Sequence, residues 1–301
     1  MTAKHSVILA GTRGDSVVTP HYQGEEHDLS GLRRQVLSRQ QIARDLRRLG
    51  VKAAQTLLVH ASLRSIGWVE GGAETVVGAL RDVLGPDGTL VVPTTTADNS
   101  DTSRLHLSRI ANLTKGEAEA FRDEMVPFHR DSTPSTGMGL IAEAVRTNPE
   151  AIRSDHPQTS FASLGRRAAE LMDGHRLTCH LGDESPLGKM YVQQASVLLL
   201  GVGFGACTAF HLAEYWYTLP APVRTYRCVV TNSEGRDWIT YEDVVLDDSD
   251  FHILGVEFDE SEILDRGQVG AAECRLMPLR QIVDFASRWM REHRSDPSRS
   301  E

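Results

Sequence analysis

The sequence predicts an α/β protein with a mixed central sheet flanked by helices and an antiparallel β appendage in its C-terminal half. Two short apolar segments, Thr56–Ala61 and Thr89–Pro93, enclose a helical pattern and predict a βαβ unit. A continuous apolar run over residues 197–203 is typical of a strand buried on both faces. Residues 224–232 and 237–245 flank an Asn-Ser-Glu-Gly turn and predict a pair of strands.

Helical spacing and turn residues predict the remaining elements. Residues 32–49 place apolar side chains at helical intervals among arginines, and Gly50 ends that helix. Residues 153–164, with the sequence RSDHPQTSFASL, are predicted to form a turn-rich loop. Ser185 and Pro186 suit the N-cap and first position of a helix. Further helices are predicted over residues 73–84, 140–146, 166–171 and 279–291.

Length and composition predict an ordinary globular protein. The chain has 301 residues, of which 40% are hydrophobic and 24% charged, and one large α/β core can accommodate most of them. We expect an N-terminal extension of unclear structure over residues 1–30 and a single domain over residues 31–292. Within that domain, residues 220–260 are predicted to form a β-rich sub-domain. Residues 293–301 read as a frayed tail.

The charge and cysteine content of the chain favour some classes of partner and site over others. The formal charge of −9, from 41 acidic and 32 basic residues, argues against nucleic acid or an anionic membrane as partner and favours a cationic ligand. The four cysteines form no CxxC pair, so neither a metal site nor a disulfide framework is predicted. No apolar stretch approaches the roughly 20 residues that span a bilayer. We therefore expect a soluble, cytoplasmic protein.

A histidine and a glutamate follow the apolar run of residues 197–203. Thr208 is a candidate N-cap for a helix that carries His211 and Glu214 three residues apart. This spacing places both side chains on one helix face, just beyond the carboxyl end of a strand, where open α/β sheets bind ligands. The pair is a candidate for general base catalysis. The alternative is a solvated pair on the protein surface.

The loop after the first predicted strand carries groups suited to an anion. Ser62, Arg64 and Ser65 lie between a strand and a helix, where hydroxyls, a guanidinium and backbone N–H groups can bind phosphate. The loop contains neither GxxxxGKS nor GxGxxG, and an ordinary capped βα loop explains the same residues. His156 precedes a proline and therefore has an extended backbone, which also suits a structural hydrogen-bonding role.

Acidic residues gather in two polar segments. The connection after residue 93 is long, and loops of such length rarely lack secondary structure in a compact domain. We therefore predict a short helical excursion or lid there. Its carboxylates, and those of a later cluster, could bind a polyamine or could simply be solvated. They are Asp98, Asp101, Asp123 and Glu124 in the connection and Asp247, Asp248 and Asp250 in the cluster.

The motifs together resemble the aminoglycoside 3-N-acetyltransferase family, from about residue 35 to about residue 292. The resemblance implies transfer of an acetyl group from acetyl-CoA to the 3-amino group of deoxystreptamine, giving antibiotic resistance. It implies the family's own α/β fold, distinct from that of the GCN5-related acetyltransferases, in a monomer or homodimer. The matching segments are VHASLRSIGWVEGGAETVVGALRDVLGPDGTLVVPT, TPSTGMG, RSDHPQTSFASLG, GDESPLGKMY and LLLGVGFGACTAFHLAEYW.

The resemblance also implies roles for individual residues. His211 matches the family's candidate general base, with Glu214 in the matching acidic position and Asp183 as a further partner. Residues expected to surround CoA are His60, Ser62, Leu63, Arg64, Ser65, His156, Ser160, Phe161 and Ala162. Carboxylates expected to face the aminoglycoside are those of Asp98, Asp101, Glu124, Glu214 and Asp248. Cys207 departs from the family pattern, which often has asparagine at that position.

Direct attack of the amine on the thioester, in a ternary complex, is the mechanism that these roles imply. Ser160 or Thr208 are candidates for stabilising the oxyanion. The competing mechanism uses Cys207 as a nucleophile, since it lies four residues before His211. Two other functions fit the sequence: non-catalytic binding of cationic drugs, and CoA-dependent acylation of another amine.

Overall fold

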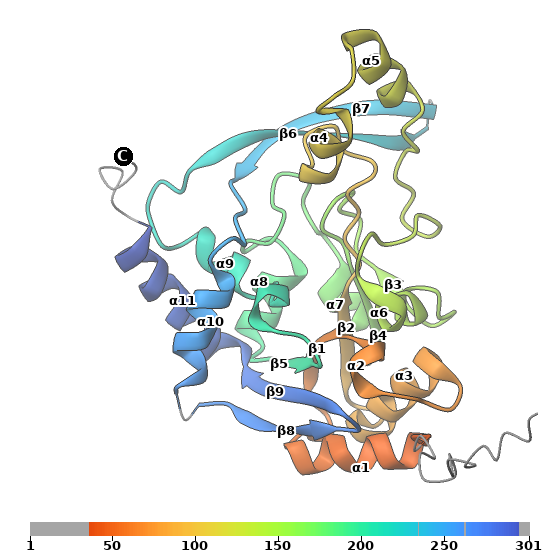
Figure 1. Ribbon diagram of the computed structural model, residues 1–301, viewed down its shortest axis with the longest axis vertical. Coiled ribbons are helices and arrows are strands. Elements are labelled where there is room, and N and C mark those ends of the chain that lie inside the picture. The colour runs from red at the N-terminus through yellow and green to blue at the C-terminus, as the bar shows by residue number, and fades with distance from the viewer. Residues whose placement is uncertain (1–35, 234, 262, 295–301) are drawn as a thin grey trace, which may run out of the picture. The chain divides into compact units, whose positions relative to one another are not determined.

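The computed structural model describes residues 36–233, 235–261 and 263–294, and the predicted extension over residues 1–30 lies outside them (Figure 1). The elements below belong to one compact unit that begins at residue 35. Its centre is a seven-stranded sheet with the order β3-β4-β2-β1-β5-β9-β8. Strands β2 and β5 pair in parallel with β1, whereas β3, β4, β8 and β9 join in antiparallel pairs. The predicted mixed sheet is confirmed.

The bounds of β1 and β2 agree with those predicted. Apart from His60, both strands consist of apolar or β-branched residues, nearly all of them buried, which fit a sheet that is covered on its two faces. The strands run over β1 (Thr56–Ala61), β2 (Thr89–Pro93), β3 (Ile152–Arg153), β4 (Phe161–Gly165), β5 (Ser196–Leu200), β8 (Asp265–Val269) and β9 (Ala272–Pro278).

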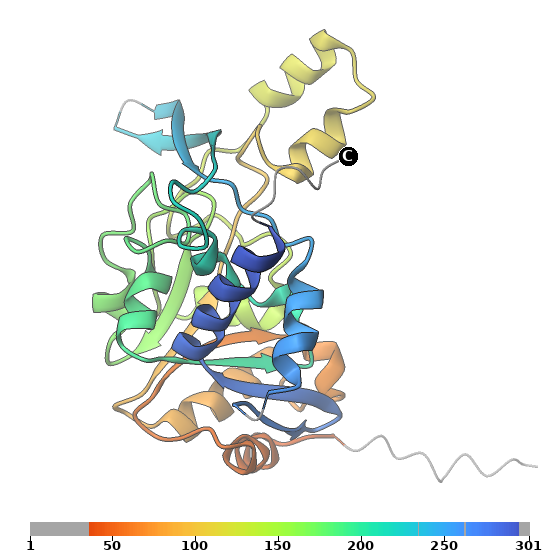
Figure 2. The same cartoon turned by 90° about the vertical axis from the view of Figure 1, so that its left-hand side faces the viewer.

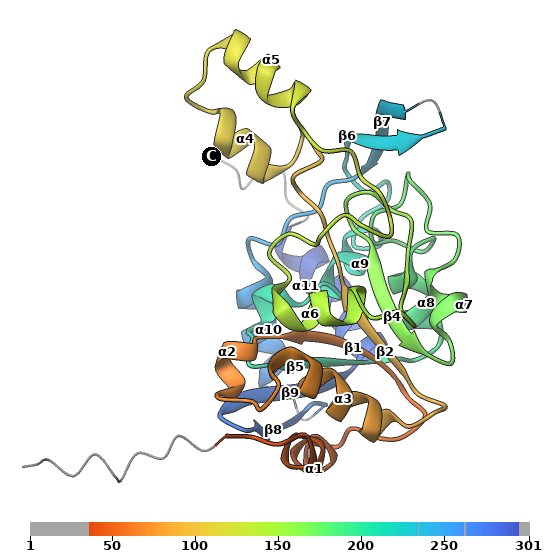
Figure 3. The same ribbon diagram turned by 90° about the vertical axis from the view of Figure 1, so that its right-hand side faces the viewer.

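Two hydrophobic cores cover the two faces of the sheet. Successive side chains of a strand alternate between faces, so Leu57 and Val59 enter one core and Leu58 the other. The first core packs against α1 (Arg39–Leu49), α3 (Gly72–Leu84) and α6 (Gly139–Arg146), and Figure 3 shows α3 and α6 over that face. The second packs against α7 (Ala168–Met172), α8 (Pro186–Val192), α9 (Phe210–Glu214), α10 (Phe251–Asp259) and α11 (Leu279–His293). Figure 2 shows α11 in dark blue across that side.

Helix ends follow local capping chemistry. Helix α1 begins at Arg39, later than predicted, because Ser38 and Gln41 form a capping box. It ends where predicted, at Gly50, whose φ of 110° is readily adopted by glycine. The predicted cap of α8 is confirmed, since the hydroxyl of Ser185 accepts hydrogen bonds from the next helical N–H groups and Pro186 follows.

The predicted antiparallel appendage is a separate two-stranded sheet. Strands β6 (Val223–Asn232) and β7 (Gly235–Val244) pair along their whole length. Helices α4 (Arg104–Ile110) and α5 (Lys115–Asp123) fill the polar connection after β2 and lie on the same side of the main sheet as the hairpin (Figure 1). The β-rich part ends at Val244, because residues 251–259 form α10; the prediction of a β-rich sub-domain to residue 260 was wrong beyond the hairpin.

The loop predicted over residues 153–164 is replaced by β3, a short turn and β4. Strand β4 pairs antiparallel with β2, opposite Leu90 and Val91, and its apolar side chains enter both cores. Pairing with a buried strand and burial of Phe161 therefore outweigh the local turn signals of the sequence. Two short elements also lie in predicted loops, α2 (Leu63–Ile66) and η2 (Phe204–Ala206).

Candidate active site

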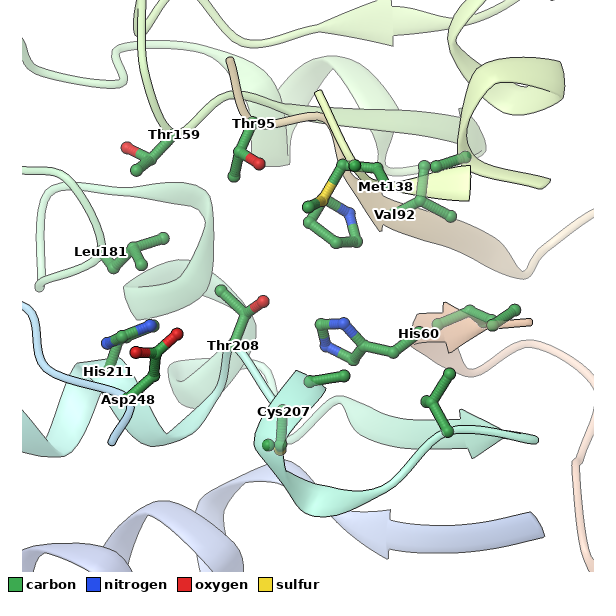
Figure 4. A pocket seen from close by; sticks show the side chains of 18 of the residues that line it. His60, Val92, Thr95, Met138, Thr159, Leu181, Cys207, Thr208, His211 and Asp248 are labelled. Atoms are coloured by element: carbon green, nitrogen blue, oxygen red, sulfur yellow. The ribbon is translucent and has the colours of Figure 1, made fainter. Parts of the chain in front are cut away.

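A cavity of about 330 Å³ opens at the carboxyl ends of the parallel strands. Strand β1 lies between β2 and β5, and open α/β sheets bind ligands where the strand order reverses in this way. The ends of β1 and β2, the start of α6, the segment after β5, and α9 all line the cavity. Figure 4 shows His60 reaching into it from one side and His211 with Asp248 on the other.

The segment after β5 reaches the cavity because the chain turns sharply at Gly201. Its φ is +68°, and a Cβ atom there would lie 2.5 Å from the Cβ of Ser65, so glycine is required. Helix α9 begins at Phe210 with Ala209 as N-cap, and the prediction of Thr208 as the cap was wrong. Thr208 instead lines the cavity, in the turn between η2 and α9.

His211 and Glu214 form a hydrogen-bonded pair on the cavity wall. His211 Nδ1 lies 2.7 Å from Glu214 Oε2, a geometry in which the ring N–H donates to the carboxylate. The His211 side chain is 15% exposed, whereas Glu214 is fully buried, so the alternative of a solvated surface pair does not describe them. His211 Nε2 makes no hydrogen bond to any described residue and is the ring nitrogen left to accept a proton.

The second oxygen of Glu214 is held by groups that the sequence did not indicate. Oε1 accepts hydrogen bonds from the backbone N–H of Asp247 at 2.9 Å and from Arg294 Nη1 at 2.7 Å. Arg294 also pairs with Asp250, which raises the pKa of this guanidinium. Both carboxylate oxygens of Glu214 are thus engaged inside the protein, which does not fit its prediction as a substrate-binding residue.

Cys207 lines the cavity but its thiol is not activated. The residue is fully buried, and burial raises the pKa of the thiol to about 12. A nucleophilic cysteine needs a thiolate, which forms beside cationic or metal partners that lower the pKa. The buried surroundings of Cys207 raise the pKa of its thiol and so disfavour the thiolate.

His60, near the end of β1, lines the cavity opposite His211. It is 6% exposed, and burial, with a smaller contribution from the His211 ring, lowers the pKa of its imidazole to about 3. Its Nε2 is buried without a hydrogen-bond partner among the described residues. The side chain is therefore neutral at physiological pH.

The two serines of the loop after β1 serve the fold. Ser62 caps α2 by accepting hydrogen bonds from the N–H and hydroxyl of Ser65, and the Ser65 hydroxyl also bonds the carbonyl of Gly201. Leu63 and Arg64 border a shallow surface hollow instead of the main cavity. The alternative of an ordinary capped βα loop therefore explains the two serines. Arg64 is an exposed cation in α2, just after β1.

Four residues of the predicted CoA region, around β4, are enclosed in the protein. His156 Nδ1 accepts hydrogen bonds from the backbone of Gln158 and Thr159, and Nε2 donates to Leu177, so both nitrogens are used structurally. Ser160, Phe161 and Ala162 are fully buried and none of them lines the cavity. Thr159, which lies within the segment 156–162 that the resemblance assigns to the CoA region but was not singled out there, does line the cavity.

One of the predicted substrate carboxylates lines the cavity. Asp248 does so, and it pairs with Arg104 of α4 at 2.5 Å. Asp98 pairs with Arg109 and Asp101 with Arg227, both away from the cavity lining. Glu124 is exposed at the end of α5 and also lies outside that lining. Asp183, which was predicted as a further catalytic partner of His211, does not line the cavity either and accepts a hydrogen bond from Trp216.

The described part of the chain offers neither a metal-binding cluster nor a membrane-spanning helix. No group of three or more histidine, cysteine, aspartate or glutamate side chains is arranged there to hold a metal ion. None of the described helices combines the length and apolar character needed to cross a membrane.

The similarity of this chain to known proteins identifies its family. The family model described as aminoglycoside 3-N-acetyltransferase matches residues 58–291, a span that contains most of β1, all residues that line the cavity, and the His211–Glu214 pair. The chain belongs to the aminoglycoside 3-N-acetyltransferase family. The resemblance seen in the sequence is confirmed, and the chain is an enzyme of the acetyltransferase class.

Individual members of the family are similar over most of their length. The SPbeta prophage-derived aminoglycoside N(3')-acetyltransferase-like protein YokD of Bacillus subtilis is 38% identical, covering 84% of this chain and 92% of its own. Its crystal structure superposes with a TM-score of 0.81 and covers 87% of this chain and 96% of its own. Aminoglycoside N(3)-acetyltransferase VII of Streptomyces paromomycinus is 32% identical over 85% and 92% of the two chains. A structure of AAC-IIIb with CoASH is 25% identical, with a TM-score of 0.75 over 86% and 97% of the chains.

Proposed function

We propose that this enzyme transfers an acetyl group from acetyl-CoA to the 3-amino group of the deoxystreptamine ring of aminoglycosides, with His211 as general base. The observation that carries the proposal is the buried His211–Glu214 pair on the wall of the cavity. The family to which the chain belongs and the CoASH bound by AAC-IIIb support the choice of reaction and co-substrate. Acetylation removes a positive charge from the drug, which accounts for resistance.

The cavity has two chemically different ends. Apolar side chains of β1, β2 and α6 line the end near His60, among them Val59, Val92 and Ile141. This lining suits the thin, largely uncharged arm that carries the thioester. Thr208, His211 and Asp248 make the other end polar and acidic, which suits an amine-bearing sugar. The two reactants would then meet at His211.

In the proposed reaction, one proton leaves to solvent and His211 carries a second proton from the amine to the CoA sulfur. An aminoglycoside ammonium first releases one proton to solvent, and the neutral amine attacks the thioester carbon. As the C–N bond forms, His211 Nε2 takes the second proton, and Glu214 stabilises the imidazolium through Nδ1–H. The C–S bond breaks with its electron pair on sulfur, and the imidazolium returns its proton to give the CoA thiol.

Direct transfer is favoured over an acetyl-cysteine intermediate by the state of Cys207. With its pKa raised to about 12, the thiol carries almost no thiolate at neutral pH. Because the amine and the thioester can be held together in one cavity, positioning can supply several kcal/mol of the rate enhancement without a covalent step.

The experiment is release of CoA thiol from acetyl-CoA in the presence of a panel of aminoglycosides, with mass spectrometry and NMR of the products to locate the acetyl group. His211→Ala should lower kcat by about 100-fold or more while circular dichroism stays unchanged. His252→Ala, at an exposed position of α10, is the matched control.

Near-normal turnover by His211→Ala would refute the base assignment. A wild type that binds aminoglycosides without releasing thiol would instead be a non-catalytic binder, and a product acetylated elsewhere would correct the substrate position.

A further inference from the structure

His60 is a buried histidine that the fold leaves without a hydrogen bond. Buried polar groups almost always have a partner, and an exception calls for an explanation. Three other buried histidines of the described chain have both ring nitrogens engaged: His156, His175 and His180. His106 also lacks partners, but it packs against Phe121 away from the cavity, whereas His60 lies on the cavity wall.

The position of His60 in β1 aims it at the reactants. Alternation along the strand puts His60 on the face of Leu58, which is the face that α9 covers. Figure 4 shows the ring extending into the cavity, with Thr208 between it and His211. None of the described residues that line the cavity, polar or apolar, hydrogen-bonds the His60 ring. A ligand atom is therefore the remaining partner for a ring N–H of His60.

We infer that a ring N–H of His60 donates a hydrogen bond to the carbonyl oxygen of the bound thioester and to the oxyanion formed from it. This inference rests on the proposed function and adds the oxyanion donor to it. When the amine attacks, the C=O π electrons move onto oxygen, and a donor placed there beforehand stabilises that charge without reorganising. His60 keeps its proton throughout, and the C=O bond re-forms as the C–S bond breaks.

A neutral imidazole suits this position better than a charged one. A permanent cation at residue 60 would oppose the protonation of His211, on which proton transfer depends. Burial keeps His60 neutral while leaving one ring N–H for donation. Of the two hydroxyl residues predicted for this role, Ser160 donates to the carbonyl of Thr94 and does not reach the cavity, whereas Thr208 lines it.

The first test reads the carbonyl directly, without turnover. Acetyl-CoA labelled with ¹³C at the carbonyl is bound to the wild type and to His60→Leu, and the thioester C=O stretch is recorded by infrared difference spectroscopy. The wild type should show the stretch at lower frequency, and the shift should be lost in His60→Leu. His252→Leu, at an exposed position of α10 outside the cavity lining, is the control and should keep it.

The second test separates binding from catalysis. His60→Leu should lower kcat by about 100-fold with the KM for acetyl-CoA changed less than about threefold. His60→Asn, which retains an N–H donor and guards against a folding failure of the first variant, should recover part of the loss.

Equal carbonyl frequencies in wild type and variant, or an increased KM with unchanged kcat, would overturn the assignment of His60. A wild type without aminoglycoside turnover overturns the proposed function, and the frequency shift of bound acetyl-CoA still decides the role of His60. A wild type that does not bind acetyl-CoA overturns both.

Discussion

Replacing His60 with leucine should make the protein less sensitive to acid. Burial lowers the pKa of His60 to about 3 in the folded protein, whereas a histidine in an unfolded chain titrates near about 6.5. Between these values the unfolded chain binds a proton that the folded protein does not. The stability contributed by neutral His60 is therefore present above about pH 6.5 and is lost as the pH falls.

The size of the effect at pH 5 follows from the same two values. There the unfolded chain is favoured by RT ln(1 + 10^1.5), or about 2 kcal/mol, relative to high pH. Any folded-state pKa below about 4 gives nearly the same result, because His60 is then neutral at pH 5 in the folded protein. The figure therefore depends on burial of the ring more than on the particular value of its pKa.

The assay is urea unfolding, followed by far-UV circular dichroism, at pH 7 and pH 5. The free energy of unfolding of the wild type should fall by about 2 kcal/mol more than that of His60→Leu. His175, whose pKa is lowered to about 4, remains in both proteins and adds equally to both losses. His252→Leu, at an exposed position, should behave as the wild type. Equal losses for the wild type and His60→Leu, within about 0.5 kcal/mol, would refute the reasoning.

Three further substitutions test the groups around His211. Glu214→Gln keeps the side-chain shape but removes the charge that orients the ring, so kcat should fall by about 1,000-fold with little change in KM, and a loss below tenfold would argue against the pair. Cys207→Ala should leave the steady-state rate within about threefold, whereas near-total loss, with an acetylated wild type seen by intact mass, would reinstate the nucleophile. Arg294→Met removes a guanidinium partner of buried Glu214 and should lower the free energy of unfolding by about 3 kcal/mol in urea titrations; a change below about 0.5 kcal/mol would show that the carboxylate needs no such partner.

The sequence could predict features that depend on local pattern. Apolar runs located β1 and β2 to the residue, and the spacing of three brought His211 and Glu214 together. The serine and proline that begin α8 were likewise readable, because a cap involves only its own neighbours. Position beyond the carboxyl end of β5 was enough to place His211 at the cavity.

Features created by distant contacts could not be predicted in this way. Arg294 reaches Glu214 from 80 positions along the chain, and no local pattern marks it. Strand β4 was missed because the turn residues before it dominate the local signal, while its pairing with β2 is set by the sheet. Conversely, Phe161 and Ala162 match a family motif, yet their burial shows that a shared motif can preserve the core instead of the ligand site.

The contact between Arg104 and Asp248 bears on how a polycation would enter. In the unliganded protein the carboxylate of Asp248 already has a guanidinium as counter-ion, supplied by α4. If Asp248 binds an ammonium group, as proposed above, that group would replace Arg104, and because both side chains are about half exposed or more, the exchange would cost about 1 kcal/mol or less. Because Arg104 also contacts Asp247 at 3.2 Å, such an exchange would remove one of the two ion pairs that tie α4 to this segment, so that occupancy of the cavity and the attachment of α4 become linked.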